Sequence, residues 1–401
     1  YAKQNGGTYE FIVEAQKHKA IPVEQRFWED LFANSTKWGL TNYEQDWLHN
    51  EFEGLNCTLE SATLARKWLL QMGSAASNNG IKIQYCMAWP RHVLQSVEVA
   101  AVSNFRASDD YQSDPGQWKL GLSSLIANAL GLAPSKDNYW SKHEQPGNNW
   151  NLREPYSELQ SAVSSFTAGP VAPSDMIGHS NVELILRACN ADGLLLKPSR
   201  PATSIDSTFA FRAFGRGGPD GEILATHSDL GSLRFHHVLI ADLKQPFNLS
   251  TSELPGYDSG SRTIAYEGGD TSVTNVTLLA FDAQHPIYLR AVGKSDFRVL
   301  HVAPVLLNGW AILGELAKWI PTSPERILRV IVEEEGLSVS LRGASGEDLE
   351  ISLLTPSNTI LRASCKLPAS GVATLWVPTK SQIPAAVCRE VLDMPSEHIV
   401  V

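Results

Sequence analysis

Hydrophobic and polar residues change pattern several times between residues 27 and 158. Apolar residues occur at helical spacing in RFWEDLFANSTKW (26–38) and in LESATLARKWLLQMGSAASNNG (59–80), and the second segment ends in glycine. An extended or buried-strand pattern follows each of them, in GLTNYEQDW (39–47) and IKIQYCMAW (81–89). A chain in which strands and helices take turns in this way is expected to form parallel βα units.

The same alternation continues to about residue 205 in shorter segments. Strand patterns occur in VEVAAVSNF, LAPSKDNYW and VAPSDMIG, and helical patterns occur in LGLSSLIANALG and SELQSAVSSFTAGP. From about Asp206 the pattern changes to β-branched alternation with Gly, Asp and Pro turns, as in STFAFRAFG, LRFHHVLIADL and FRVLHVAPVLL. The chain is therefore expected to be α/β followed by all-β, with one or two antiparallel β-sandwich domains.

The all-β part divides in two on this interpretation. Residues 206–309 are expected to form the antiparallel β-sandwich. A helix flanked by prolines is expected at 310–324, and the β segments that follow it predict an additional small β domain over 310–401.

Composition excludes several classes of protein. The 401 residues are 43% hydrophobic and 19% charged, which is enough for two or three domains with ordinary cores. A formal charge of −10 argues against nucleic acid or an anionic membrane as the partner. No apolar stretch approaches the roughly 20 residues of a membrane helix. The first residue is Tyr and no signal-peptide pattern follows it, which suggests a processed or trimmed chain.

Sequons and cysteines favour the secretory route. Four glycosylation sequons begin at Asn34, Asn56, Asn248 and Asn275, so a secreted or lysosomal glycoprotein is expected. The five cysteines show no metal-ligand spacing, so neither a metal site nor a cofactor is predicted. Disulfide bonds are expected to involve Cys57, Cys86, Cys365 and Cys388. Cys57 is expected to bond to Cys86 across adjacent strand ends, against the alternative of two buried free thiols.

Charged and aromatic residues gather at the ends of the predicted parallel strands, where α/β folds carry their chemistry. The candidates are Asp46 and Trp47 in the first strand end, Trp89 and Arg91 in the second, Arg106, Asp109 and Asp110 in the third, and Lys136, Asp137 and Trp140 in the fourth. Two carboxylates on different strands are what a retaining glycosidase needs. One attacks the anomeric carbon, while the other, about 5–5.5 Å away, protonates the leaving oxygen.

The order of these motifs resembles the second half of the barrel in the alpha-galactosidase and alpha-N-acetylgalactosaminidase clan of glycoside hydrolases. In that clan the fourth strand ends in the nucleophilic Asp, which falls on Asp46 in LTNYEQDW, and the fifth carries Cys followed by Trp-Pro, matched by YCMAWP with one extra residue. The sixth carries Arg and then the acid/base Asp. Counted from Arg106, that residue is Asp110, with Asp109 as the runner-up.

The resemblance implies that residues 1–205 form the C-terminal part of a (β/α)8 barrel, about strands 4–8, before the sandwich begins near LLLKPSRPATSID. Half a barrel does not close. A second chain, a neighbouring subunit or a longer parent chain is therefore expected to supply the amino-terminal strands. Ala88 before Trp89-Pro90 is similar to the relatives that bind 2-acetamido sugars, where galactosidases carry an acidic residue.

Each candidate also has a structural alternative. Asp46 and Asp110 could equally cap helices, and Asp109 could orient Arg106. Arg106 could bind a carboxylate of the protein as readily as a substrate. Lys136 and Asp137 fit a solvated ion pair, and the tryptophans fit core positions. Two functions stay open: a retaining glycosidase acting on alpha-linked galactose-type or 2-acetamido sugars, and a glycan-binding or structural glycoprotein that kept the hydrolase fold.

Overall fold

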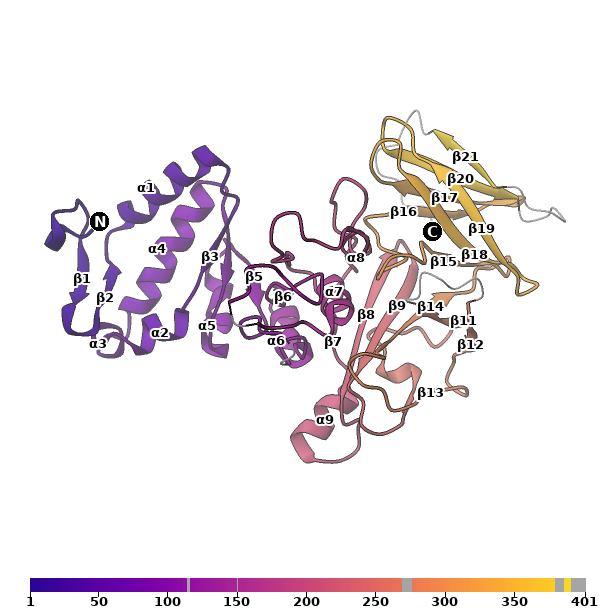
Figure 1. The fold of residues 1–401 in the computed structure, drawn as a ribbon, viewed down its shortest axis with the longest axis horizontal. Helices are drawn as coiled ribbons and strands as arrows, with labels where there is room; N and C mark the ends of the chain where they lie inside the picture. The colour runs from indigo at the N-terminus through magenta and orange to yellow at the C-terminus, as the bar shows by residue number, and fades with distance from the viewer. Residues whose placement is uncertain (114–115, 150, 269–275, 379–385, 391–401) are drawn as a thin grey trace. The chain divides into compact units, whose positions relative to one another are not determined.

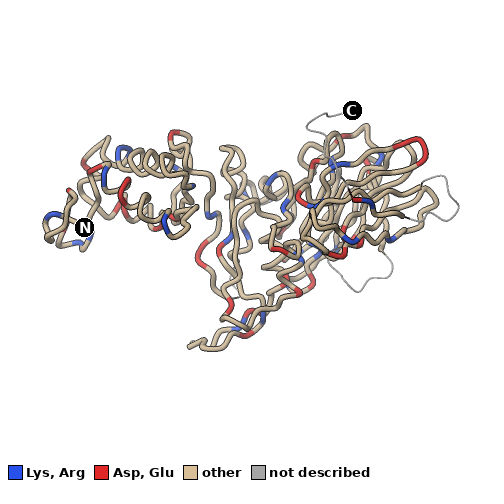
Figure 2. The backbone as a smooth tube through the Cα atoms, turned by 90° about the horizontal axis from the view of Figure 1, so that it is seen from above, with Lys and Arg blue, Asp and Glu red and all other residues tan. Residues whose placement is uncertain are grey.

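The computed structural model describes residues 1–113, 116–149, 151–268, 276–378 and 386–390 (Figure 1). The chain divides into two compact units. The first unit comprises residues 1–109 and 123–137, and the second comprises residues 110–122 and 138–401. Along the described part of the backbone, Lys and Arg residues are interspersed with Asp and Glu residues, and no long basic tract occurs there (Figure 2).

The first unit contains a parallel four-stranded sheet in the order β3-β4-β5-β6. Its strands are β3 Asn42–Gln45, β4 Lys82–Tyr85, β5 Val102–Arg106 and β6 Ala133–Ser135, and a separate hairpin pairs β1 Phe11–Glu14 with β2 Lys19–Pro22. The helices are α1 Gln25–Ser35, α2 Leu48–Glu53, α3 Asn56–Leu59, α4 Leu64–Asn78, α5 Pro90–Gln95 and α6 Gly121–Ala129, and the last spans both units. The predicted parallel βα order is thus present.

Helices α1 and α4 lie side by side along this sheet (Figure 1). Their apolar faces explain the packing, because Trp28 and Phe32 of α1 are buried and lie 6.3 and 5.2 Å from the ring of Tyr43 on β3. Trp68 and Met72 on α4 are buried as well. One face of β3 is therefore fixed to the helices by aromatic burial.

The second unit is mostly antiparallel β-structure. Its largest sheet has six strands in the order β12-β11-β14-β9-β8-β7, and smaller sheets have the orders β15-β18-β19, β16-β17-β20-β21 and β10-β13. The strands are β7 Thr203–Ser204, β8 Glu222–Leu230, β9 Leu233–Ala241, β10 Phe247–Leu249, β11 Thr263–Gly268, β12 Leu278–Ala280, β13 Ile287–Leu289, β14 Arg298–Pro304, β15 Ala311–Gly314, β16 Ile327–Val332, β17 Gly336–Arg342, β18 Asp348–Leu354, β19 Ile360–Lys366, β20 Val372–Pro378 and β21 Val387–Glu390. The helices of this unit are α7 Ser157–Phe166, α8 Val182–Leu186 and α9 Asp206–Phe214.

Three sequence predictions are wrong here. VAPSDMIG (171–178) was expected to be a strand, but it forms only an isolated bridge between Pro173 and Tyr139. STFAFRAFG was expected to be β-structure, but it forms α9, which has Asp206 in its first turn and ends at Gly215 in the left-handed conformation. These are helix-start and helix-stop signals that outweigh the alternation of Phe. The helix expected at 310–324 is also absent, because Ala311–Gly314 forms β15 and pairs with β18. Complete burial of Ala311, Ile312 and Leu313 makes them equally compatible with a buried strand.

The described residues contain a parallel sheet and several antiparallel sheets, but no closed barrel. The barrel, the sandwich arrangement and the three-domain division at 205 and 309 stay predictions. No helix in the described ranges is long and apolar enough to cross a membrane.

Candidate functional site

The candidate site lies at the carboxyl edge of the parallel sheet in the first unit. Because β3, β4, β5 and β6 run in the same direction, the loops that follow them leave from one edge. Eight of the predicted residues belong to this unit and lie at or after these strand ends: Asp46, Trp47, Trp89, Arg91, Arg106, Asp109, Lys136 and Asp137. The sequence interpretation therefore placed most of its candidates on one edge of one sheet.

Asp46 is exposed directly after β3. Its Oδ1 accepts a hydrogen bond of 2.7 Å from the backbone N–H of Trp47, which has a positive φ of 59°. Left-handed backbone costs free energy in a bulky residue, and such strain is found at functional sites. The positive φ at Trp47 turns the chain sharply, so the Asp46 carboxylate and the Trp47 indole are neighbours at the sheet edge.

Cys86, directly after β4, lies close enough to Asp46 and to Arg106 to be influenced by both. Burial raises the pKa of the Cys86 thiol, and a hydrogen bond with Asp46 raises it further, whereas the charge of Arg106 opposes the shift. The Cys86 thiol therefore stays protonated at neutral pH, under the influence of both Asp46 and Arg106. The sequence predicted Asp46 and Arg106 as site residues, and it had no signal for the place of Cys86 near them.

Two exposed tryptophans flank the same edge. Trp47 is 49% exposed and Trp89 is 48% exposed. His49 lies between them, stacked on Trp47 with ring centroids 5.9 Å apart and edge-on to Trp89 at 5.7 Å. The backbone N–H of His49 donates to the carbonyl of Met87 at 3.0 Å, which ties the two loops together. Half-exposed indoles beside a carboxylate suit the apolar face and hydroxyl groups of a sugar.

Arg106 makes a described ion pair with Asp137 on the adjacent strand end. The guanidinium Nη1 lies 3.6 Å from Asp137 Oδ1, and both side chains are largely shielded from solvent. Lys136 is 2% exposed and its Nζ donates to the Asp137 carbonyl at 2.9 Å. The alternative of a solvated Lys136 and Asp137 pair is therefore wrong, since Lys136 is buried. A clamp on a carboxylate is one role of Arg106, and contact with substrate stays a prediction.

The described contacts of Arg91 and Asp109 are with residues outside this cluster. Arg91 lies on α5 and forms an exposed ion pair with Glu53 at 3.1 Å. Asp109 is exposed, and its carbonyl accepts a hydrogen bond from the Ser108 hydroxyl at 3.0 Å. The described ion pair of Arg106 is with Asp137, so orientation of Arg106 by Asp109 stays a prediction.

One face of the sheet next to the edge is polar. In register, Glu44 lies beside Gln84, and Gln84 lies beside Asn104. Asn104 is 6% exposed; its Nδ2 donates to Asn42 Oδ1 at 3.0 Å, and its own Oδ1 has no partner among the described residues. None of these residues was predicted as a site residue from the sequence, although the alternation of Asn42, Tyr43 and Glu44 gives the signal. A polar sheet face leading to the strand ends offers hydrogen bonds to a hydroxylated ligand.

Asp110 and Trp140 belong to the second unit. Asp110 is exposed, and its carbonyl accepts a hydrogen bond from Gln117 Nε2 at 3.2 Å. Trp140 is half-buried, with its ring edge-on to Tyr111 at a centroid distance of 6.1 Å. The pairing of Asp46 with Asp110 as nucleophile and acid/base therefore stays a prediction.

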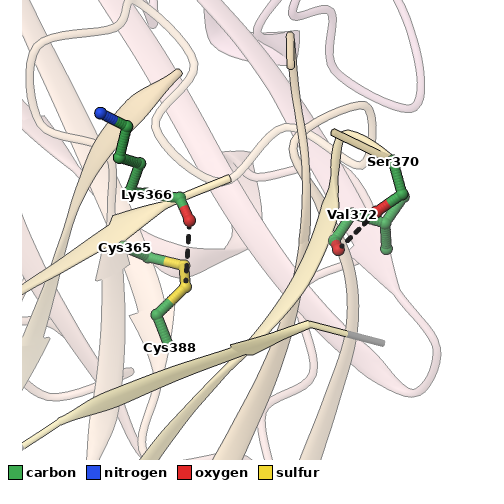
Figure 3. The surroundings of a disulfide bond; sticks show 5 residues. All are labelled: Cys365, Lys366, Ser370, Val372 and Cys388. Carbon is green, nitrogen blue, oxygen red and sulfur yellow. Dashed lines mark hydrogen bonds between the residues drawn. A yellow bond between two sulfur atoms is a disulfide. The ribbon is translucent and has the colours of Figure 1, made fainter. Parts of the chain in front are cut away.

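The cysteines differ in part from expectation. Cys365 of β19 and Cys388 of β21 form a disulfide bond (Figure 3). The bond expected between Cys57 and Cys86 is not formed, because Cys57 lies on α3 rather than at a strand end. There its backbone N–H donates to Glu14 Oε1 at 2.9 Å. Both thiols are free, as is that of Cys189.

Three of the four sequon asparagines are exposed: Asn34, Asn56 and Asn248. Asn275 lies outside the described residues. Glycosylation at all four stays a prediction. Among the described residues, no cluster of three or more His, Cys, Asp or Glu side chains could hold a metal ion.

Comparisons with known proteins find similarity among solved structures only. No protein-family model matches the chain, and a search of curated proteins finds no match. A beta-arabinopyranosidase structure matches with 12% identity and a TM-score of 0.39, over 70% of this chain and 42% of that chain. A glycoside hydrolase family 5 protein from Bacteroides vulgatus ATCC 8482 matches with 10% identity and a TM-score of 0.26, over 75% of this chain and 95% of that chain.

A third match is BuGH86 in complex with neoagarooctaose, with 12% identity and a TM-score of 0.25, over 79% of this chain and 57% of that chain. This chain thus spans less than half the length of the arabinopyranosidase. The neighbours include glycoside hydrolases, but scores of this size do not establish a shared fold. The assignment of a function therefore depends on the residues of this chain.

Proposed function

We propose that this chain is a secreted retaining glycoside hydrolase that acts on alpha-linked galactose-type or 2-acetamido sugars. The observation that carries the proposal is the strand-end cluster, in which exposed Asp46 is followed by half-exposed Trp47, His49 links Trp47 to Trp89, and Asp46 and Arg106 both act on Cys86. Aromatic stacking surfaces next to a carboxylate are typical of sites that bind and cleave sugars. Carbohydrate is accordingly the proposed ligand.

The proposed mechanism assigns a different task to each of two carboxylates. Asp46 attacks the anomeric carbon and forms a glycosyl ester, while the leaving oxygen takes a proton from Asp110. Asp110 then removes a proton from water, which attacks the anomeric carbon and releases Asp46. The two steps invert the anomeric centre twice, so the product keeps the configuration of the substrate.

The site residues support positioning as well as chemistry. Trp47 and Trp89, linked through His49, offer ring faces for the apolar side of the sugar. The ion pair of Arg106 with Asp137 holds a planar donor group at the carboxyl end of the same sheet as Asp46. Ala88, before Trp89, is a small residue at the position where the resemblance implies a site for a 2-acetamido group, which is the basis for including acetamido sugars.

The test is turnover of activated aryl alpha-galactosides and alpha-N-acetylgalactosaminides by the wild type and by Asp46→Ala, Asp110→Ala and Asp109→Ala. Loss of the nucleophile should abolish nearly all turnover. Loss of the acid should spare substrates with good leaving groups, which need little protonation. Asp109→Ala tests the runner-up for the acid/base: if it shows the loss expected of Asp110→Ala and Asp110→Ala does not, that role belongs to Asp109. Unchanged turnover in Asp46→Ala overturns the assignment of the nucleophile.

The second candidate is a glycan-binding glycoprotein without turnover. It is favoured by the engagement of Asp46 Oδ1 with the backbone of Trp47, which is the contact that a purely structural Asp would make. Saturable glycan binding without hydrolysis of either substrate class would support it. The companion chain that supplies the amino-terminal barrel strands also stays a proposal, so both assays include preparations co-purified with any associated polypeptide.

A further inference from the structure

The second unit contains a cavity of about 430 Å³, and its lining residues are not those of the strand-end cluster. Its lining residues come from three segments of that unit, 111–113, 138–152 and 174–176. Within the middle segment they are residues 138, 140, 145–148 and 152. Ligand pockets in proteins have volumes of about 300–1,000 Å³, so the cavity is large enough for a small organic molecule.

A carboxylate fixes two of these segments to each other. Asp175 Oδ1 accepts hydrogen bonds from the Ser141 backbone N–H at 2.8 Å and from Gln145 Nε2 at 2.6 Å, and Oδ2 accepts one from the Ser141 hydroxyl at 2.5 Å. Gln145 Oε1 in turn accepts from the Met176 backbone N–H at 2.9 Å. A carboxylate oxygen can accept two hydrogen bonds, so Oδ2 keeps capacity for a donor from a ligand.

An aromatic pair forms another part of the lining. Trp140 is half-buried, and the Tyr111 ring is edge-on to it at 6.1 Å. The Tyr111 hydroxyl donates to Glu154 Oε2 at 2.6 Å, and Glu154 is only 1% exposed. Burial raises the pKa of Tyr111, and the bond to Glu154 adds to the shift, so the phenol stays neutral. The aromatic part of the lining is thus held in place from behind.

Asn148 contributes an acceptor that the protein does not use. Its Nδ2 donates to the Leu152 carbonyl at 2.6 Å, but its Oδ1 is shielded from solvent and accepts no hydrogen bond from the described residues. A shielded acceptor without a donor costs free energy. A rotation of the Asn148 side chain that turned this oxygen into the cavity would let a ligand hydroxyl remove the cost.

The charge of the lining selects among possible ligands. Among the described residues that line it, Asp175 is the only one with a charged side chain, and none is Lys, Arg or His. A phosphate, sulfate or uronate group would face this carboxylate without a compensating cation, which disfavours anionic ligands. Hydroxyl donors and an apolar ring face match a carboxylate, an amide oxygen and an indole.

We infer that this cavity is a binding site for a neutral saccharide unit, with Trp140 as the stacking surface and Asp175 and Asn148 as hydroxyl acceptors. The choice of galactose-type sugars as first probes rests on the proposed function. The site itself lies in the second unit and is tested by binding rather than by turnover.

The experiment uses the full chain labelled with 5-fluorotryptophan and observed by ¹⁹F NMR, with the Trp140 signal assigned by Trp140→Phe. The probes are methyl alpha-galactoside, methyl N-acetyl-alpha-galactosaminide and methyl alpha-galacturonate, the last being the galactoside with a negative charge. We expect a saturable shift of the Trp140 signal with at least one neutral glycoside, and at least a tenfold weaker affinity for the galacturonate.

Asp175→Asn should weaken the neutral glycoside about tenfold or more, because it removes a charged acceptor. Asp192→Asn is the matched control, since Asp192 is an exposed carboxylate of the same unit that does not line the cavity. The other signals of the 11 tryptophans report whether the variants are folded. If Asp175→Asn misfolds, Asn148→Ser takes its place, with weakened binding again expected.

The inference is overturned if no neutral glycoside moves the Trp140 signal, if the galacturonate binds as well as the galactoside, or if the folded Asp175→Asn or Asn148→Ser variant binds normally. The signals of Trp47 and Trp89 separate this result from the proposed function. A response of those two with a silent Trp140 refutes the cavity and leaves the hydrolase proposal standing. A response of Trp140 alone, without turnover, supports the cavity and refutes the hydrolase proposal.

Discussion

A cluster of buried histidines predicts that the protein loses stability in mild acid. His227 on β8, His236 and His237 on β9 and His301 on β14 are each 8% exposed or less. His237 pairs in register with His301, and their Nδ1 atoms are 2.8 Å apart. Burial lowers the pKa of His227 to about 4 and that of His236 and His301 to about 3, and it holds His237 well below its ordinary value.

The sign of the effect follows from the lowered pKa values. The folded state keeps these rings neutral, whereas the unfolded chain takes up protons near pH 6.5, so acid favours the unfolded state. The stability is fully present above about pH 6.5 and is lost progressively as the pH falls toward 4. Asp229, 3.2 Å from His227, opposes the loss at that histidine only in part.

The magnitude can be worked out for a change from pH 7.5 to 5.5. Each histidine that stays neutral in the folded state lowers the unfolding free energy by about 1.4 kcal/mol at pH 5.5. The reason is that in the unfolded chain the protonated form of its ring outnumbers the neutral form about tenfold at that pH. The three with pKa values near 3 or 4, namely His227, His236 and His301, therefore remove about 4 kcal/mol together. A total stability of about 5–15 kcal/mol makes this a large fraction.

The assay is urea denaturation at both pH values, for the wild type, His236→Gln and the exposed control His18→Gln. His236→Gln should lose about 1.4 kcal/mol less than the wild type on acidification, and His18→Gln should match the wild type. Comparison of variants cancels other titrating groups, including buried Lys197, whose pKa burial lowers to about 7. Glu14, with its pKa lowered to about 2 mainly by backbone hydrogen bonds, loses its contribution only below about pH 4.5. Equal stability of the wild type at pH 7.5 and 5.5 would refute the reasoning.

Three further predictions concern interactions that stabilise one unit or the other from within. Arg326 is fully buried and binds two glutamates, so Arg326→Met should lower the unfolding free energy from urea denaturation by about 3–5 kcal/mol. Arg362→Met at an exposed ion pair should lower it by less than about 1 kcal/mol, and equal losses would contradict this prediction. Replacing both Cys365 and Cys388 by Ser should lower the unfolding free energy by about 3 kcal/mol, because the bond closes a loop with a separation of 23 residues, and an unchanged midpoint argues otherwise. Phe32→Ala should cost about 3–5 kcal/mol, since the ring is completely buried, and a cost below 1 kcal/mol would show that the first unit repacks freely.

The first unit was predictable where local patterns decide the structure. The pattern of 59–80 gave α4, and the buried run after it gave β4, because amphipathic periodicity and a terminal glycine act locally. The strand ends followed from these elements, and with them the place of Asp46 and Trp89. Burial on all sides removes the period, and for that reason the residues of β15 were mistaken for a helix.

The parts that could not be predicted depend on contacts between distant segments. His49 joins Trp47 to Trp89 through the carbonyl of Met87, 38 residues away, and no spacing rule shows that contact. The free thiols of Cys57 and Cys86 depend likewise on where α3 lies. Neighbouring residues can also belong to different units, as happens at the 109–110 boundary, and the sequence NFRASDDY contains no sign of it.

The most direct test of the central claim is to identify the residue that becomes covalently glycosylated during turnover. The protein is incubated with 5-fluoro-alpha-galactosyl fluoride or its 2-acetamido counterpart, whose leaving group needs no protonation, and is then analysed by intact mass and peptide mapping. The account predicts one added sugar on the peptide that contains Asp46, and none in Asp46→Asn. A sugar on another carboxylate, or turnover of the reagent with no covalent intermediate and an inverted product, would contradict it.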